Sequence, residues 1–193
     1  MVSGMERKHI ITIAGKPGSG KSTISKRLAS TLGYTHFSSG DLFRRLAAEK
    51  NISVDAINLL AEQDPSIDKE VDERLRTLGE QEDNLVIDSR MAWYWIPQSY
   101  KIYLDLDLSI AADRIFNALD QDRFKVEETA QNVKEYEEQL HKRLESEAKR
   151  YLTLYQQNPY DIEHYDLVID THANNPDQVT RLILDGFTAH LGE

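Results

Sequence analysis

Residues 15–22 constrain the fold of this chain more than any other stretch. They match G-x-x-x-x-G-K-[ST], the phosphate-binding P-loop, and read Gly15, Lys16, Pro17, Gly18, Ser19, Gly20, Lys21, Ser22. A short β-branched apolar run over residues 9–14 precedes the loop and predicts a buried strand. Residues 23–32 follow with helical spacing, which stops at Gly33. The sequence therefore predicts the strand, glycine loop and helix that this mode of phosphate binding requires.

The residue types of the loop suit a nucleotide. Gly15, Gly18 and Gly20 allow a tight turn that brings backbone N–H groups close to phosphate oxygens. The helix that follows points the positive end of its dipole at the same place. Lys21 can reach the β- and γ-phosphates, and the Ser22 hydroxyl can coordinate Mg²⁺. The predicted nucleotide-binding residues are Gly15, Lys16, Pro17, Gly18, Ser19, Gly20, Lys21, Ser22 and Thr23.

Charge and composition exclude several classes of protein. The net charge of −10 argues against general affinity for nucleic acid, so a cationic pocket must gather its charges locally. No apolar run is long enough to span a membrane, and residues 1–7 lack a signal-peptide core. The absence of cysteine excludes disulfides and thiolate metal sites. We expect a cytoplasmic monomer that binds small molecules and neither nucleic acid nor membranes.

Strands and helices are predicted to alternate along the rest of the chain. Further strands are predicted at residues 34–37, 85–88, 100–105 and 166–170. Helices are predicted at residues 41–50, 53–63, 64–82, 109–119, 126–156 and 176–189, with Ser39 or Asp41 capping the first of these and Asp64 or Ser66 the third. Five short apolar strands separated by helices indicate an α/β fold, with a parallel sheet covered on both faces.

Two further stretches carry charged candidates. Asp88 ends an apolar strand, and a carboxylate at the carboxyl end of a strand beside a P-loop can hold Mg²⁺ through water. A turn cap is the alternative for Asp88. Arg143 and Arg150 lie seven residues apart, about two helical turns, so they share one face of a helix. The alternative there is an exposed helix with Glu–Arg pairs.

In its ordered set of motifs the chain resembles the nucleoside monophosphate kinases, a family of P-loop kinases. It resembles most closely the archaeal-type cytidylate kinases, over residues 9–188. The motifs that carry the resemblance are the P-loop, Ser39-Gly40-Asp41-Leu42-Phe43-Arg44, residues 61–68, Asp88-Ser89-Arg90, the helix with Arg143 and Arg150, and residues 165–171.

The resemblance implies a P-loop NTP hydrolase fold, in which helices flank a five-stranded parallel sheet of order 2-3-1-4-5. It implies one kinase domain over residues 9–190, after a disordered leader at residues 1–8. The core of this domain would comprise residues 9–38, 84–120 and 157–190. A helical acceptor-binding insert would span residues 39–83, and a short lid would span residues 120–156.

The resemblance also implies a reaction, in which the γ-phosphoryl group of ATP passes to a nucleoside monophosphate, CMP or dCMP. ATP and Mg²⁺ are the expected cofactors, with Ser22 and Asp88 organising the metal, Asp88 through water. The implied catalytic residues are Lys21, Asp88, Arg143 and Arg150. The implied acceptor-binding residues are Ser39, Asp41, Arg44 and Arg90. Guanidinium groups suit this work because they bind phosphate through two parallel N–H donors.

Alternatives remain open at this point. Ser89 stands where the family usually has glycine, and residues 91–97 depart from the family pattern. Trp93 and Trp95 lie in that stretch and either stack on the acceptor base or pack beneath the insert, and we favour packing. A P-loop kinase for another small acceptor and a non-catalytic ATP-binding regulatory protein are the rival functions.

Overall fold

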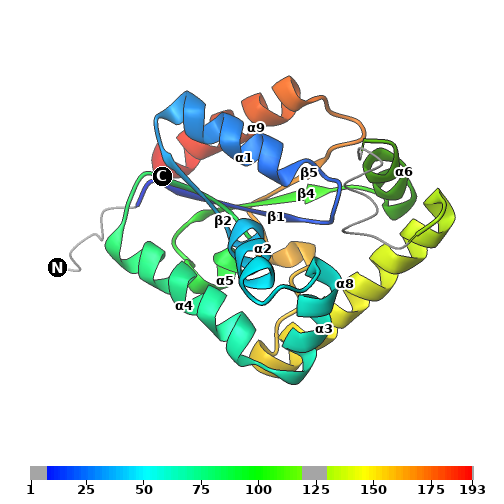
Figure 1. Cartoon of the computed structure of the whole chain (residues 1–193). Helices are drawn as coiled ribbons and strands as arrows, with labels where there is room; N and C mark the ends of the chain where they lie inside the picture. Colours follow the sequence, from blue (N-terminus) through cyan, green and yellow to red (C-terminus); the bar gives the residue numbers. More distant parts are fainter. Residues whose placement is uncertain (1–7, 119–129, 193) are drawn as a thin grey trace.

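A parallel sheet with helices on both faces forms the centre of the molecule (Figure 1). The computed structural model of the chain describes residues 8–118 and 130–192. Its strands are β1 (Ile10–Gly15), β2 (Thr35–Ser38), β3 (Leu85–Asp88), β4 (Tyr100–Asp105) and β5 (Leu167–Asp170). All four pairings are parallel and the strand order is β2-β3-β1-β4-β5, which confirms the predicted topology.

Most helices follow the predicted pattern with shifts at their ends, and a short helix after β3 was not predicted. They are α1 (Lys21–Leu32), α2 (Ser39–Glu49), α3 (Val54–Gln63), α4 (Ser66–Gln81), α5 (Ala92–Trp95), α6 (Leu108–Ala118), α8 (Val133–Tyr155) and α9 (Pro176–Gly192), with a 3₁₀ turn η1 (Ile162–His164). The predicted leader at residues 1–8 and the first part of the predicted lid lie almost wholly outside the described residues. In the described part of the chain, no helix has both the length and the apolar composition of a membrane span.

Alternation along the strands divides the core between the two faces of the sheet. Ile11 and Ile13 of β1 pack with α1 and α9 on one face. Ile10 of β1 belongs to the other cluster, with residues of α2, α3, α4 and α5. Successive strand residues point to opposite faces, so one apolar strand supplies both clusters. A smaller cluster joins α6 to α8 through residues such as Ala111 and Leu140.

Three helix starts show where local sequence decided the outcome. Ser38 caps α2, because its hydroxyl oxygen accepts from the Asp41 N–H at 3.3 Å, so the predicted caps Ser39 and Asp41 were wrong. The Asp64 carboxylate accepts from the Ser66 N–H at 2.9 Å, but Pro65 is the N-cap residue of α4, so the predicted caps Asp64 and Ser66 were wrong. Asn132 caps α8, which begins at Val133. The predicted helix over residues 126–156 was therefore wrong at residues 130–132, which are not helical.

The tryptophan segment is packed into the protein. Trp93 is buried and stacks on the His164 ring, with ring centroids 4.1 Å apart and planes 14° from parallel. Trp95 packs against the cluster that includes the insert helices and lies edge-on to the Tyr155 ring. These contacts favour the packing interpretation of both rings over a wall for the acceptor base.

Candidate active site

The P-loop has a conformation that only glycine permits at its key positions. Gly15 ends β1 with φ 143°, and a Cβ atom there would lie 2.2 Å from the Leu104 carbonyl oxygen. Gly18 has φ 73°, and its Cβ would lie 3.1 Å from Ala111. Gly20, with φ 84°, is the residue that precedes α1. Side chains at these positions would strain the backbone or displace β4 and α6.

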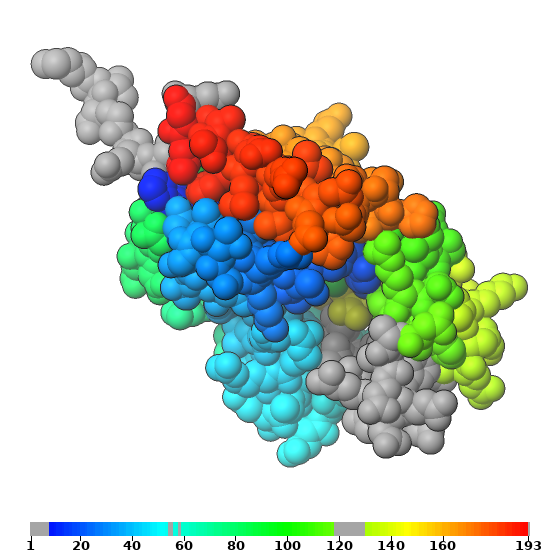
Figure 2. Space-filling view, turned by 90° about the horizontal axis from the view of Figure 1, so that it is seen from above, coloured from blue at the N-terminus to red at the C-terminus, as the bar shows by residue number. Residues whose placement is uncertain are grey.

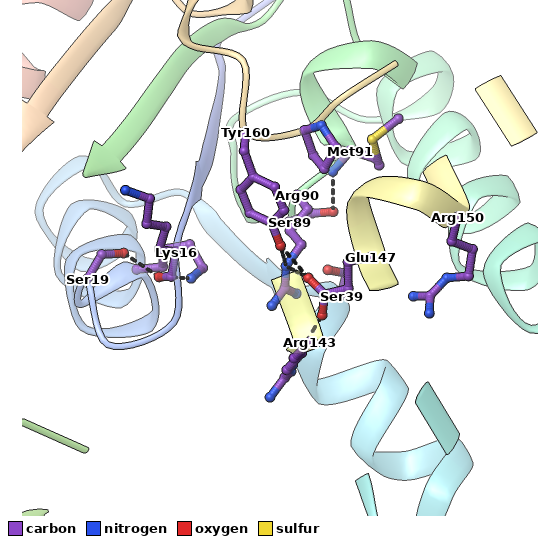
Figure 3. Close-up of polar contacts among 12 residues, drawn as sticks. Lys16, Ser19, Ser39, Ser89, Arg90, Met91, Arg143, Glu147, Arg150 and Tyr160 are labelled. Atoms are coloured by element: carbon purple, nitrogen blue, oxygen red, sulfur yellow. Dashed lines mark hydrogen bonds and ion pairs between the residues drawn. The ribbon is translucent and has the colours of Figure 1, made fainter. Parts of the chain in front are cut away.

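Side chains of the loop are tied to its own backbone. Lys21 Nζ donates to the Lys16 carbonyl oxygen at 2.9 Å, and the Ser19 hydroxyl donates to the same oxygen at 2.8 Å. Lys16 Nζ pairs with Asp105 at the end of β4 at 2.8 Å. Figure 3 shows Lys16 and Ser19 beside one another at the loop. The ammonium group of Lys21 thus lies against the backbone of the P-loop at Lys16.

The surroundings of Lys21 join the loop to charged residues from distant parts of the chain. Burial lowers the pKa of Lys21 to about 8 and the Arg90 charge adds to this effect, with a smaller contribution from Arg143. Asp88 and Glu147 act in the opposite direction. These four groups therefore lie close enough to Lys21 for their charges to act on it.

Ser22 and Asp88 meet at the start of α1. The Ser22 hydroxyl donates to Asp88 Oδ2 at 2.7 Å, and Asp88 is buried at the end of β3. The Ser39 hydroxyl donates to the Asp88 carbonyl oxygen at 3.3 Å, which places α2 beside the same strand end. A hydroxyl and a carboxylate in contact fit Mg²⁺, which prefers oxygen ligands. The described residues contain no group of three or more His, Asp or Glu side chains fit to hold a metal, so phosphate oxygens and water would have to complete the shell.

A buried carboxylate holds two of the predicted arginines. Glu147 of α8 pairs with Arg90 Nε at 2.6 Å and with Arg143 Nε at 3.1 Å (Figure 3). The Tyr160 hydroxyl donates to the same carboxylate and accepts from Arg90 Nε at 3.2 Å. Burial alone would raise the pKa of Glu147, but Arg90 and Arg143 lower it to about 2. The carboxylate is therefore ionised at any working pH.

The other two predicted arginines have partners in the insert. Arg150 is buried, and its Nε lies 2.6 Å from Oδ2 of Asp68, a residue of α4 that is 1% exposed. Arg44 is exposed and pairs with Asp41 at 2.5 Å within α2. The buried ion pair between Asp68 and Arg150 thus joins the insert helix α4 to α8.

One small cavity gathers most of the predicted acceptor-side residues. Its volume is about 50 Å³, and its walls come from α2, α4, the end of β3 and α8. The predicted site residues among its walls are Ser39, Arg44, Arg90, Arg143 and Arg150. Asp41 is not among them and lines a different hollow of about 720 Å³, whose walls come from β2, α2 and α4. Because ligand pockets usually exceed about 300 Å³, these walls must separate to admit a nucleotide.

A third hollow lies beside the P-loop, against α6 and the segment after β5. It has a volume of about 570 Å³, and its lining includes Ser19, Gly20, Thr23, Arg114 and residues 171–176. Arg114 of α6 donates to the Thr171 carbonyl oxygen at 3.0 Å. In Figure 2, the blue segment of the loop lies between the orange residues after β5 and the green α6.

Sequence reasoning missed several polar residues around these cavities. Asp68 lies inside a motif that was recognised, but its burial against Arg150 has no signature in the sequence. Glu147 is one of the glutamates covered by the alternative of Glu–Arg pairs on an exposed helix, and its burial distinguishes it from Glu145. Asp72 and Tyr160 were not singled out at all. Arg123, a weaker candidate for the lid, lies outside the described residues.

Comparisons with known proteins agree in sequence and in fold. A family model described as the cytidylate kinase-like family matches residues 10–173. A cytidylate kinase of Halobacterium salinarum is 40% identical over 187 residues, which are 95% of this chain and 92% of the relative. A cytidylate kinase of Natronomonas pharaonis is 36% identical over 183 residues, 94% of this chain and 90% of the relative.

Solved structures share the fold at low sequence identity. A shikimate kinase from Acinetobacter baumannii, solved with shikimate, superposes with a TM-score of 0.60 at 18% identity, covering 95% of each chain. At that identity the likeness concerns the fold alone. The predicted fold, a five-stranded parallel sheet flanked by helices, agrees with this likeness.

Proposed function

This chain belongs to the cytidylate kinase-like family, and from that membership we propose that it transfers the γ-phosphoryl group of ATP to CMP or dCMP, giving the diphosphate and ADP. One observation carries the proposal beyond family membership. Ser22 of the P-loop and Ser39 of α2 both donate to Asp88, two residues before Arg90, so the donor-side loop adjoins the acceptor-side residues. Such an arrangement suits phosphoryl transfer, which depends on positioning and on electrostatic stabilisation.

The donor phosphates are proposed to bind at the P-loop. Backbone N–H groups of the loop and the dipole of α1 attract them, and the Lys21 ammonium exchanges the Lys16 carbonyl oxygen for phosphate oxygens. Ser22 and Asp88 are the residues that would hold Mg²⁺, Asp88 through water. When bound, Mg²⁺ offsets charge on the β- and γ-phosphate oxygens.

The acceptor phosphate is proposed to bind between α2 and the end of β3. Arg44 and Arg90 supply paired N–H donors, and Asp41 holds Arg44 through its carboxylate. Ser39 offers a further hydroxyl from the first turn of α2. Two arginines on this side favour a phosphorylated acceptor over a neutral metabolite.

The transferring group is proposed to be stabilised from α8. Charge spreads over the three equatorial oxygens of the γ-phosphoryl group, and Arg143 and Arg150 place positive charge beside them. Closure of the insert and the lid, taken as residues 39–83 and 120–156, would exclude water and so prevent hydrolysis of ATP. We further propose that the chain works as a monomer on small-molecule nucleotides.

A coupled assay of ADP release tests this function. CMP, dCMP, UMP, AMP and GMP are each supplied with ATP and Mg²⁺, and CMP or dCMP is expected to give the highest kcat/KM. The variant Lys21→Met should abolish turnover while its circular dichroism stays that of the wild type. ADP release that peaks with a different acceptor would assign another small-molecule kinase. Tight ATP binding with no acceptor-dependent ADP would point to a regulatory ATP-binding protein.

A further inference from the structure

Glu147 has a set of contacts that a helix-surface ion pair does not have. Its side chain is 3% exposed, although most acidic residues of α8 lie at or near the surface. Oε2 pairs with Arg90 Nε at 2.6 Å, while Oε1 accepts from Arg143 Nε at 3.1 Å. Each carboxylate oxygen thus serves a different arginine, and the Tyr160 hydroxyl is a third donor. A buried carboxylate needs this number of partners to offset its loss of water.

Glu147 contacts only one nitrogen of each guanidinium in these ion pairs, which decides which N–H groups remain available to bind phosphate. Both of these contacts are made by Nε. A guanidinium has five N–H donors in a fixed planar fork, so contacts at Nε leave the terminal Nη groups able to bind phosphate. Arg90 and Arg143 line the same small cavity. Glu147 thereby fixes the plane of each fork while the phosphate-binding edge remains available.

The same contacts connect parts of the chain that are far apart in sequence. Arg90 follows β3, Glu147 and Arg143 belong to α8, and Tyr160 lies in the segment after α8. Tyr160 is itself held in place, because its backbone N–H donates to Asn158 Oδ1 at 3.1 Å. Glu147 also reduces the repulsion among three cations, since Arg90 and Arg143 both act on the Lys21 charge.

We propose that Glu147 is a positioning residue, which orients Arg90 toward the acceptor phosphate and Arg143 toward the transferring group and keeps the two in register. This inference rests on the proposed function, since it assumes that both arginines meet phosphates. Glu147 acts through the arginines and does not contact the substrate. Its removal affects the phosphoryl-transfer step more than it affects ATP binding.

Kinetics of the variant Glu147→Gln test the proposal. Glutamine keeps the shape of the side chain but loses the charge and one acceptor oxygen. We expect kcat with CMP to fall at least about tenfold and the KM for CMP to rise, while the KM for ATP changes less than about twofold. Glu145→Gln is the matched control, since Glu145 is exposed on the same helix, and it should behave as the wild type.

A double-mutant cycle distinguishes positioning from plain structural support. If Glu147 acts on the transfer step through Arg143, kcat of the double variant Arg143→Lys with Glu147→Gln should be about that of the slower single variant, while the rise in the KM for CMP, which arises through Arg90, should persist. Multiplied effects on kcat in the double variant, or wild-type kinetics of Glu147→Gln, would overturn the proposal. A wild-type enzyme that phosphorylates no monophosphate would instead reject the proposed function.

The variant Tyr160→Phe keeps the test decisive if Glu147→Gln fails to fold. It removes one neutral hydroxyl from the cluster and leaves every charge in place. We expect a smaller effect, a rise of about two- to fivefold in the KM for CMP, which disappears when Arg90 is already lysine, because the Tyr160 hydroxyl contacts Arg90 and Glu147. Full activity of Tyr160→Phe in the wild-type background, or an equal loss in both backgrounds, would overturn the proposal. Thermal melts of each variant confirm that the fold is intact before kinetics are compared.

Discussion

Two buried carboxylates, Glu147 and Asp72, differ in how their surroundings treat the ionised form. Two arginines lower the pKa of Glu147 to about 2 in spite of its burial. Burial raises the pKa of Asp72 to about 6, although a hydrogen bond from the Tyr155 hydroxyl opposes the rise. Asp72 is 5% exposed and has Asp68 and Arg150 as its charged neighbours. At neutral pH the negative charge of Glu147 therefore stabilises the folded protein, whereas the negative charge of Asp72 destabilises it.

The variant Asp72→Asn is expected to be more stable than the wild type at neutral pH. In the wild type the folded state binds a proton that the unfolded state releases between pH 4 and pH 6, so the Asp72 contribution to the free energy of unfolding falls as pH rises through that range. Asparagine has no such proton, so its advantage should be small at pH 4 and about 3 kcal/mol at pH 7.5.

Urea unfolding of both proteins at several pH values measures this difference. Glu138→Gln is the control, because Glu138 is exposed on α8. An Asp72→Asn variant that loses stability at pH 7.5, or a difference that does not change with pH, would show that burial of the charge is not costly here.

At the scale of elements, α9 shows how one glycine sets the distance between a helix and the sheet. A Cβ atom on Gly186 would lie 2.1 Å from the Tyr100 hydroxyl oxygen, and Tyr100 is buried on β4. Gly192, at the end of the same helix, has no atom within 4 Å of its Cβ position. The two glycines thus differ in packing while they share one helix.

Alanine substitutions of these glycines should have opposite effects. Alanine favours a helix over glycine by up to about 1 kcal/mol, but Gly186→Ala must displace Tyr100 and should lower the free energy of unfolding by about 1–3 kcal/mol. Gly192→Ala should be neutral or slightly stabilising. Chemical unfolding of both variants compares them, and an unchanged or raised stability of Gly186→Ala would contradict this account of the contact.

Elements with a strong local pattern were predictable from sequence. The P-loop, the five apolar strands and the long helices have periodicities or motifs that packing did not override. The four-residue α5 is too short to show a period, and the cap of α2 moved to Ser38 because several candidate residues adjoin one another. Residue types indicated the arginines of the candidate site. Their partners Glu147 and Asp68 could not be inferred, since burial depends on how α4 and α8 meet in space.

At the scale of the whole molecule, the insert and α8 are held together by contacts across helices. Arg150 pairs with Asp68, the Tyr155 hydroxyl donates to Asp72, and the Ser146 hydroxyl donates to Glu62. Most of these side chains are at least partly buried, and the Arg150–Asp68 pair is nearly inaccessible to water. Removing one member of such a pair leaves the other charged and unsolvated.

The variant Asp68→Asn is therefore expected to destabilise the protein by about 3 kcal/mol or more. The double variant Asp68→Asn with Arg150→Gln should recover part of that loss, because no unpaired charge remains buried. Chemical unfolding of the two variants and of Arg150→Gln completes the cycle. A double variant that is less stable than Asp68→Asn would indicate that the pair stabilises the fold as a unit.

The small volume of the acceptor-side cavity has a consequence for the rate of the catalytic cycle. A space of about 50 Å³ cannot admit a nucleotide unless α8 and the insert first part, and they must part again before a diphosphate can leave. Each turnover then contains two openings, and each of them would separate the buried pair of Arg150 in α8 and Asp68 in α4. The steady-state rate is expected to follow the frequency of that opening. A variant that weakens the contacts between α4 and α8 should then turn over faster than the wild type and melt at a lower temperature.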